Sequence, residues 1–481
     1  MSDAGLWSVA AMADAMNAER TGALPDAISG IAIDSRTIAP GEAFFAIQGD
    51  NHDGHNFITT ALKAGAGLAV VSAAKRSIVP APAPLLVVPD VLAGLGALAR
   101  AARARSGARI IAVTGSVGKT STKEALRLAL ASAGETHASV ASFNNHWGVP
   151  LSLARLPLSA RYGIFEIGMN HAGEITPLTR LVRPHAAIVT AIAPVHLEFF
   201  DSIEAIADAK AEIFLGVEPG GAAILNRDNA YFERLQRHAA EAGIDRVIGF
   251  GEHAGADARL LSCALQPEYS DVEADILGHR VRYRIGAPGR HLVLNSLAVL
   301  AAAQFVGADL AHAASALAES KPAVGRGTRV TLAVPDGTAL LIDESYNANP
   351  TSMRAALALL AQAPIGPRGR RIAVLGDMLE LGATGPELHR GLAEAIRAHD
   401  IDLVYCAGPL MQALWQALPS AVRGGYAESA GALEVDIVAA VRAGDAVMIK
   451  GSLGSKMGPL VKALVNADTR RPATQHAGTS R

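Results

Sequence analysis

The chain has little of several features that would mark particular classes of protein. Its 481 residues include only two cysteines, Cys263 and Cys406, which lie far apart in the sequence. We therefore expect no disulfide framework and no thiolate metal site, and we expect both cysteines to be buried structural residues. The formal net charge is only −2, so nothing indicates a binding surface for nucleic acid or for an anionic membrane.

Long uninterrupted apolar runs are also missing. The most apolar long stretch, residues 292–318, is broken by Asn295, Gln304, Asp309 and His312, so it predicts a buried helix and not a membrane span. The first residues lack the basic segment and apolar core of a secretory signal. These absences predict a cytoplasmic protein with no membrane insertion.

Half of the residues are hydrophobic but only 4% are aromatic, so the core must be built from small and aliphatic side chains, as is usual in α/β folds. The pattern predicts three domains. Residues 1–85 carry short strand-like runs and predict a small N-terminal α/β domain. Residues 86–323 alternate strands and helices and predict a central, mostly parallel, ATPase-like sheet domain. Residues 324–481 predict a C-terminal Rossmann-like domain with a disordered tail from about residue 468.

Individual strands are expected where short apolar runs are bounded by turn residues. In the central domain these runs are 110–113, 162–167, 186–191 and 222–225, followed by the more alternating segments 258–264 and 281–285, which predict an antiparallel edge. In the C-terminal domain they are 340–343, 371–375, 403–406 and 446–449.

The most informative segment is the glycine-rich turn at residues 114–121, between the apolar run 109–113 and the helix-forming segment 122–133. Such a turn points several backbone N–H groups at one place, beside the positive end of a helix dipole. Lys119 adds a charge for phosphates, and the Thr120 hydroxyl suits Mg²⁺. The alternative is a turn that contains glycine and lysine by chance, but the strand, the turn and the helix follow one another in the order that a phosphate-binding loop requires. We expect a nucleoside triphosphate to bind through Thr114, Gly115, Ser116, Val117, Gly118, Lys119, Thr120 and Ser121.

Polar side chains follow the next strands of the central domain, where open α/β sheets place their ligands. Glu166 and Asn170 follow one strand and His196 follows another. With Thr120 they could hold one or two hard cations beside the phosphates, although each alone would be an ordinary loop residue. Asn144 and Asn145, in a turn that ends at Pro150, could orient a polar substrate.

Together with further motifs, these segments resemble the Mur ligases, the ATP-dependent amide-forming family of cell-wall precursor synthesis. The resemblance covers nearly the whole chain and rests on Asp34-Ser-Arg36, Asp53-Gly-His55, the loop 114–120, Phe143-Asn-Asn…Gly-Val-Pro150, Glu166-Ile-Gly-Met-Asn170, His196-Leu, Ala209-Lys-Ala-Glu-Ile213, His291…Asn295, Gly325-Arg326, Asp343-Glu-Ser-Tyr-Asn-Ala-Asn-Pro350 and Gly376-Asp-Met-Leu-Glu-Leu-Gly382.

The resemblance implies a monomeric three-domain enzyme with UDP-muramoyl-tripeptide on the first domain and ATP on the second. The strings 346–350 and 377–382 resemble the family member that adds D-alanyl-D-alanine, so this dipeptide is the expected second substrate, brought by the third domain. Phosphoryl transfer to the peptide carboxylate would give an acyl phosphate, which the amine attacks. The third residue of the tripeptide, lysine or diaminopimelate, stays open.

The resemblance also implies individual roles. Lys119 would contact ATP phosphates, Thr120 and Glu166 would bind Mg²⁺, and His196 would help bind a second Mg²⁺. Lys210 would be carbamylated and support that ion. The remaining contacts would be Asn295, with His291 beside it, for adenine; Arg326 for the γ-phosphate; Asp343 for the nucleotide; Tyr346, Asn347 and Asn349 for the gap between nucleotide and dipeptide; Asp377 and Glu380 for the dipeptide ammonium; and Ser35 and Arg36 for the uridine diphosphate.

Near the end the sequence departs from the family pattern. Leu453 and Gly458 stand where an Arg and a Glu are expected, which leaves Ser452 and Lys456 as uncertain dipeptide or phosphate contacts, and Glu344 replaces a second Asp. Two alternatives stay open. A folylpolyglutamate synthase or another Mur-type ligase would share the central site but lack the strings 346–350 and 377–382. A nucleotide-switch or motor ATPase would share only Lys119 and Thr120.

Overall fold

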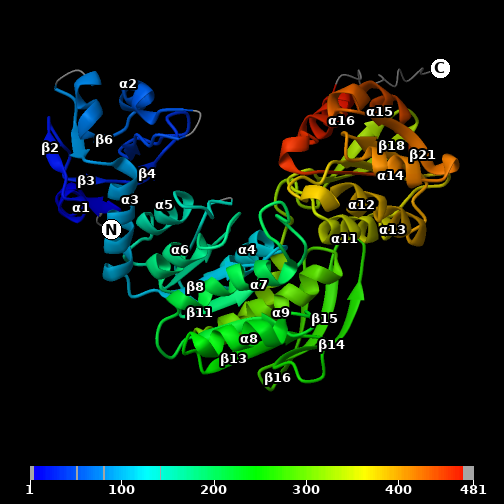
Figure 1. Ribbon diagram of the computed structural model, residues 1–481, viewed down its shortest axis with the longest axis horizontal. Coiled ribbons are helices and arrows are strands. Elements are labelled where there is room, and N and C mark those ends of the chain that lie inside the picture. The colour runs from blue at the N-terminus through cyan, green and yellow to red at the C-terminus, as the bar shows by residue number, and fades with distance from the viewer. Residues whose placement is uncertain (1–4, 50–51, 80–81, 141, 470–481) are drawn as a thin grey trace, which may run out of the picture.

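The computed structural model describes residues 5–49, 52–79, 82–140 and 142–469. They form three mixed α/β units along the chain, and Figure 1 shows the first and the last standing at opposite ends of the central one. Within these residues, no helix has the length and hydrophobicity that crossing a membrane requires.

The N-terminal unit is a five-stranded sheet in the order β2-β7-β6-β5-β4, parallel except for the β2–β7 pair. Its last strand is β7, so the domain boundary expected at residue 85 falls on that strand's first residue. Helices α1 and α3 cover one face and α2 the other. The elements are β1 (Trp7–Ser8), α1 (Val9–Met16), β2 (Glu19–Thr21), β3 (Ala27–Ile28), β4 (Ile31–Ala32), β5 (Ala43–Phe45), η1 (Gly54–Phe57), α2 (Ile58–Lys63), β6 (Leu68–Ser72), η2 (Ala73–Ile78), β7 (Leu85–Val88) and α3 (Val91–Arg105).

The central unit is a nine-stranded sheet in the order β16-β15-β14-β13-β12-β11-β8-β10-β9. The strands from β9 to β14 pair in parallel, whereas β14, β15 and β16 pair antiparallel, so the predicted antiparallel edge is confirmed. The elements are β8 (Arg109–Thr114), α4 (Lys119–Ala131), β9 (Thr136–Ala138), α5 (Gly148–Ala154), β10 (Tyr162–Glu166), α6 (Ile175–Val182), β11 (Ala186–Val189), α7 (Ile203–Ala211), η3 (Glu212–Gly216), β12 (Ala222–Asn226), α8 (Phe232–Glu241), β13 (Arg246–Gly251), β14 (Ala258–Leu265), β15 (Ser270–Ile276), β16 (His279–Ile285), α9 (Arg290–Phe305), α10 (Leu310–Ala316) and η4 (Leu317–Glu319).

Two apolar cores lie on the two faces of this sheet. Helices α4, α9 and α10 pack on one face, and α5, α6, α7 and α8 pack on the other. Burial on both faces explains why the strands are continuous apolar runs and not alternating ones. Helix α3 also packs against α5, which joins the N-terminal unit to the central one.

The C-terminal unit is a six-stranded sheet in the order β17-β18-β22-β19-β20-β21, parallel except for the β17–β18 hairpin. That hairpin was not predicted. Helix α16 runs to Thr469, so the tail expected to be disordered from residue 468 begins inside this helix, and residues 470–481 lie outside the described residues. The elements are β17 (Thr328–Val334), β18 (Gly337–Glu344), α11 (Pro350–Ala361), β19 (Arg371–Gly376), η5 (Gly382–Thr384), α12 (Gly385–Arg390), α13 (Leu392–Ala398), β20 (Leu403–Ala407), α14 (Gln412–Ala417), η6 (Ser420–Val422), β21 (Arg423–Ala427), η7 (Ala430–Leu433), α15 (Glu434–Ala440), β22 (Ala446–Lys450), η8 (Leu453–Ser455) and α16 (Gly458–Thr469).

Both cysteines are free thiols. Cys406 lies in the buried core of the C-terminal sheet, as expected. Cys263 packs against the core of the central unit but is only partly buried, since it lies on β14 in the antiparallel edge of the sheet. The expectation of two buried cysteines is therefore wrong for Cys263.

Candidate active site

A cavity of about 470 Å³ lies between the central and C-terminal units. Its walls come from the glycine-rich turn, the ends of β10 and β11, the start of α9, the hinge before β17, and the ends of β18 and β22. Fifteen of the predicted site residues line it: Ser116, Val117, Gly118, Lys119, Thr120, Ser121, Asn144, Glu166, Asn170, His196, Asn295, Arg326, Tyr346, Asn347 and Asn349.

The glycine-rich turn connects β8 to α4 and can only be built with glycine at two positions. Gly115 has φ +141°, and a Cβ there would lie 2.0 Å from Thr190 Oγ1. Gly118 has φ +90°, and its Cβ would lie 2.5 Å from Asn295 Nδ2. Any larger residue would therefore be strained and would fill the space in front of the N-terminus of α4, where an anion binds.

Lys119 folds back over this turn, and its Nζ donates to the Gly115 carbonyl at 2.7 Å. Burial lowers the pKa of Lys119, nearby Glu166 opposes this shift, and Arg326 adds to it. Arg326, from the hinge, lines the same cavity as this lysine. Two cations without a fixed counterion favour a bound polyanion such as a triphosphate.

Glu166 ends β10 inside the cavity and is almost fully buried. One carboxylate oxygen, Oε1, accepts a hydrogen bond from Asn144 Nδ2 at 2.7 Å. The other, Oε2, is buried and has no hydrogen-bond partner among the described residues. An unpaired buried carboxylate oxygen is costly unless something satisfies it, and a divalent cation would do so.

Thr120 lies at the start of α4, and its hydroxyl is 3.4 Å from Ser142 Oγ. Among the described residues, no three His, Cys, Asp or Glu side chains gather into a group that could hold a metal ion. A cation here would therefore need phosphate oxygens or waters to complete its coordination, which is how Mg²⁺ is usually held. The residues present fit Mg²⁺ in that form.

Lys210 lies on α7 and is buried. Burial, together with the charge of Lys119, lowers the pKa of Lys210 well below its ordinary value. It forms no ion pair with any described residue. A buried amine of this kind is neutral much more readily than a surface lysine.

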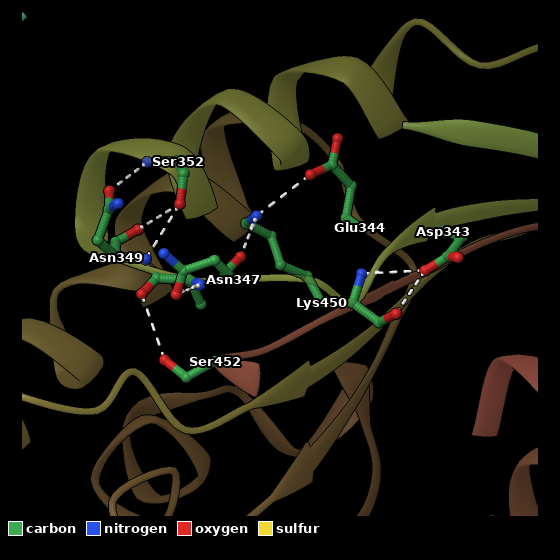
Figure 2. A network of polar contacts seen from close by, with 9 residues as sticks. Asp343, Glu344, Asn347, Asn349, Ser352, Lys450 and Ser452 are labelled. Carbon is green, nitrogen blue, oxygen red and sulfur yellow. Dashed lines mark hydrogen bonds and ion pairs between the residues drawn. The ribbon is translucent and has the colours of Figure 1, made fainter. Parts of the chain in front are cut away.

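Two groups from the C-terminal unit face these side chains. The Arg326 guanidinium carbon lies 4.2 Å from the centre of the Tyr346 ring, so the ring holds the guanidinium at the cavity wall. Lys450 Nζ donates to Glu344 Oε2 at 3.2 Å and to the Asn347 carbonyl at 2.9 Å. Figure 2 shows this lysine under the turn that carries residues 344–349. Its bonds fix the turn.

Lys450, Glu344 and Ser142 also line the cavity but were not among the residues predicted for the site, whereas His291, expected beside Asn295, lines it too. Lys450 and Glu344 end adjacent parallel strands and are register partners in β22 and β18. Opposite charges at the ends of two apolar runs were therefore a usable signal in the sequence. The pairing of the strands, which the sequence does not give, was needed to interpret it.

Several predicted residues do not reach the cavity. Asp343 accepts hydrogen bonds from Ser345 N and Oγ at 3.0 and 2.6 Å, and its neighbour Glu344 faces the cavity instead. Asp377 is buried, accepts from Met411 N at 2.9 Å, and burial raises its pKa, so it is a poor partner for an ammonium group. Neither side chain lines the cavity in this structure, because each accepts hydrogen bonds from loop backbone, and both assignments stay predictions.

The contacts predicted at Glu380, Ser452 and Lys456 do not line the cavity either. Ser452 is buried and accepts from Leu379 N at 3.0 Å, and Lys456 is exposed away from the cavity. Glu380 contacts His196, with 2.6 Å between Oε2 and Nδ1, and therefore meets an imidazole where an ammonium was expected. Leu453, at the first departure from the family pattern, is 67% exposed.

Some predicted residues lie near the cavity or in another unit. Thr114, Gly115 and Lys210 stand behind its lining, and the Asn145 side chain caps α5 by accepting from Gly148 N at 2.9 Å. Ser35 and Arg36 belong to the N-terminal unit, where Arg36 pairs with Asp34 at 2.6 Å. That pair lowers the pKa of Asp34 to about 2.

A second cavity of about 70 Å³ adjoins the first between α4, α9 and the hinge. It is mostly apolar, and Asn295 and Arg326 line both cavities. The smaller cavity therefore extends the larger one with an apolar surface beside α4.

Comparison with known proteins identifies the family. Three family models match: "Mur ligase family, catalytic domain" over residues 27–103, "Mur ligase middle domain" over 113–303, and "Mur ligase, glutamate ligase domain" over 325–453. The chain belongs to the Mur ligase family. As in that family, it is an ATP-dependent ligase, and the three-domain α/β fold predicted from the sequence is confirmed.

Individual relatives share one name. UDP-N-acetylmuramoyl-tripeptide–D-alanyl-D-alanine ligase from Escherichia coli K12 is 34% identical and covers 94% of this chain and 97% of its own. The ligase of the same name from Bacillus subtilis 168 is 32% identical, covering 92% and 94%. A crystal structure of MurF from Acinetobacter baumannii superimposes with a TM-score of 0.81 at 28% identity, over 96% of this chain and 99% of that one.

Proposed function

We propose that this Mur ligase joins D-alanyl-D-alanine to UDP-N-acetylmuramoyl-tripeptide, with cleavage of ATP to ADP and phosphate. The observation that carries the proposal is the cavity itself, which places the glycine-rich turn opposite Tyr346, Asn347 and Asn349 of the C-terminal unit. A nucleotide and an amine-bearing substrate could therefore meet in one enclosed space. The names of the relatives from Escherichia coli and Bacillus subtilis agree with these substrates.

The nucleotide would lie with its phosphates on the turn, near Lys119, and its adenine in the smaller cavity near Asn295. Arg326 would contact the γ-phosphate, because a guanidinium stays charged and can bond two oxygens at once. The cations align two anions, the triphosphate and the peptide carboxylate, which otherwise repel each other.

Mg²⁺ would be held by Thr120 and Glu166, with a second ion near His196. When bound, Mg²⁺ neutralises phosphate charge and supports in-line transfer. Glu166 supports this role because its Oε2 has no other partner among the described residues. The carboxylate also keeps Asn144 oriented toward the cavity.

Lys210 would carry a carbamate. The neutral amine attacks CO₂, a C–N bond forms, and one proton leaves, so a cation becomes an anion that can support the second Mg²⁺. The lowered pKa of Lys210 favours the neutral amine that this step requires. A buried lysine without an acidic partner would otherwise only destabilise the fold.

The uridine diphosphate would lie on the N-terminal unit, with Ser35 and Arg36 among its contacts. The protein would act as a monomer in the cytoplasm, where ATP is available. Asn170 would contact the peptide from the loop after β10, where it lines the cavity.

The test is to mix purified protein with ATP, Mg²⁺, UDP-muramoyl-tripeptide and one amine at a time, and to measure phosphate and product mass. We expect phosphate release only when tripeptide and D-alanyl-D-alanine are both present. Tripeptides ending in lysine and in diaminopimelate are tested side by side. Phosphate release without either co-substrate would indicate a switch ATPase, and turnover with a folate and glutamate would indicate a folylpolyglutamate synthase; both would overturn the proposal.

A further inference from the structure

One contact joins the central and C-terminal units directly at the edge of the cavity. Glu380 Oε2 lies 2.6 Å from His196 Nδ1, and Glu198 N donates to the Glu380 carbonyl at 3.2 Å. His196 follows β11 of the central sheet and Glu380 follows β19 of the C-terminal sheet, 184 residues apart. The contact therefore depends on how the two units are placed.

Both partners have an unusual backbone. His196 has φ +56° and Glu380 has φ +62°, and neither is glycine. Such a conformation is costly for a residue with a side chain and persists only when its surroundings hold it. Because both strained residues face each other across a domain boundary, we infer that their backbones are held in this form so that the two side chains can meet.

The contact also determines which ring nitrogen carries the proton. An ionised carboxylate can only accept, so His196 Nδ1 must donate and Nε2 of the neutral ring keeps its lone pair. His196 lines the same cavity as Glu166 and Thr120.

We propose that Glu380 is a positioning residue for His196, which fixes the imidazole in the Nδ1–H form and leaves Nε2 to ligate a divalent cation. Carboxylates that orient a ligating histidine in this way are common around metal ions. Here the carboxylate comes from another domain, so the cation site is complete only when the C-terminal unit stands in this position. The inference rests on the proposed cation role of His196.

The first test needs no metal. Full-length protein labelled with ¹⁵N-histidine is compared at pH 8 as wild type, Glu380→Ala, Glu380→Gln and Glu387→Gln. The His196 signals are those that disappear in His196→Gln. We expect the Nδ1–H form in wild type, a shift toward the Nε2–H form in Glu380→Ala, and partial retention in Glu380→Gln, whose amide oxygen still accepts. Glu387 is exposed on α12, so Glu387→Gln should match wild type. An unchanged tautomer in Glu380→Ala would overturn the proposal.

The second test counts bound cations. Mn²⁺ is titrated into each variant with a non-hydrolysable ATP analogue and followed by electron paramagnetic resonance. We expect one Mn²⁺ to bind about 10–100-fold more weakly in Glu380→Ala, while nucleotide affinity and the thermal unfolding midpoint stay near wild type. Equal Mn²⁺ affinity in wild type and Glu380→Ala would contradict the positioning role alone. If wild type and His196→Gln bind Mn²⁺ equally, the cation role of His196 fails instead, and the histidine spectra distinguish the two outcomes.

Discussion

The two walls of the main cavity differ in whether their lysine is paired with a carboxylate. In the central unit, Lys119 lines the cavity and forms no ion pair with a described carboxylate, and burial lowers its pKa. In the C-terminal unit, the buried Lys450 is bonded to Glu344 and to a backbone carbonyl. On the first wall the positive charge is available to a bound anion. On the second wall it pairs with a carboxylate of the protein itself.

The difference separates residues that bind from residues that hold structure. A buried cation without a counterion destabilises the free protein, and its cost is recovered only when an anion arrives. A buried cation with a carboxylate stabilises its own loop and adds little attraction for a further anion. We therefore expect substitutions on the first wall to affect turnover and those on the second to affect stability.

The largest expected effect is that of Lys119→Ala. Removing the charge that faces the phosphates should lower kcat/KM for ATP by about 10³-fold, with little change in folding. Phosphate release with all substrates present measures it. Lys462→Ala, on the exposed side of α16, is the matched control and should match wild type. Near-normal turnover in Lys119→Ala would show that the glycine-rich turn is not the phosphate site.

Lys210→Ala should be nearly as severe. The loss of the proposed carbamate should reduce turnover by roughly 10²–10³-fold, because charge stabilisation beside the phosphates is lost. Small carboxylates or bicarbonate should restore part of it, since they can replace the missing anion in the space that the side chain leaves. Lys119→Ala offers a control, because the same additives should not rescue it. Unchanged turnover in Lys210→Ala would remove this role.

Lys450→Met should act mainly on stability. Glu344 would stay largely buried without its partner, so the C-terminal unit should lose about 3 kcal/mol in urea unfolding. The double variant Lys450→Met/Glu344→Gln should recover part of this loss, because no uncompensated charge remains. A loss of turnover with unchanged unfolding would place Lys450 with the binding lysines and break the comparison.

The smallest effect concerns Asp53 in the N-terminal unit, a carboxylate that is already paired with a cation. Burial alone would raise the pKa of Asp53, but hydrogen bonds from Lys75 and His55 outweigh it and hold the value at about 2. Because the folded pKa is lowered, the stabilisation is present above about pH 4 and is lost as pH falls toward 2. Asp53→Asn should thus cost about 1 kcal/mol at pH 7, since solvent still reaches the carboxylate. At pH 2 the substitution should cost almost nothing. An equal loss of unfolding free energy at pH 7 and pH 2 would show that the ionised carboxylate is not the source of the stabilisation.

The sequence predicted the central wall better than the C-terminal one. The glycine-rich turn, Glu166 and His196 follow apolar runs whose ends must meet at one edge of a parallel sheet, so local patterns were sufficient. Asp377 and Ser452 also follow such runs, but their side chains accept hydrogen bonds from the backbone of other loops, at Met411 and Leu379. Which way a strand-end side chain turns depends on neighbouring loops, and no local pattern contains that information.

Contacts between distant segments were the least predictable part. The β17–β18 hairpin, the Lys450–Glu344 pair and the Glu380–His196 contact each depend on strand order or domain placement. The nine-stranded sheet could be anticipated because its strands alternate with helices. Its pairing order, and the position of the C-terminal unit against it, required the structure.

The shared lining of the cavity has a consequence for how the protein unfolds. Side chains from two units, each with its own hydrophobic core, surround the same space, so a ligand that binds there contacts both units. Without a ligand, heating can melt the two cores in separate steps. A saturating nucleotide should merge these steps into one, because neither core can open without releasing what the other also holds.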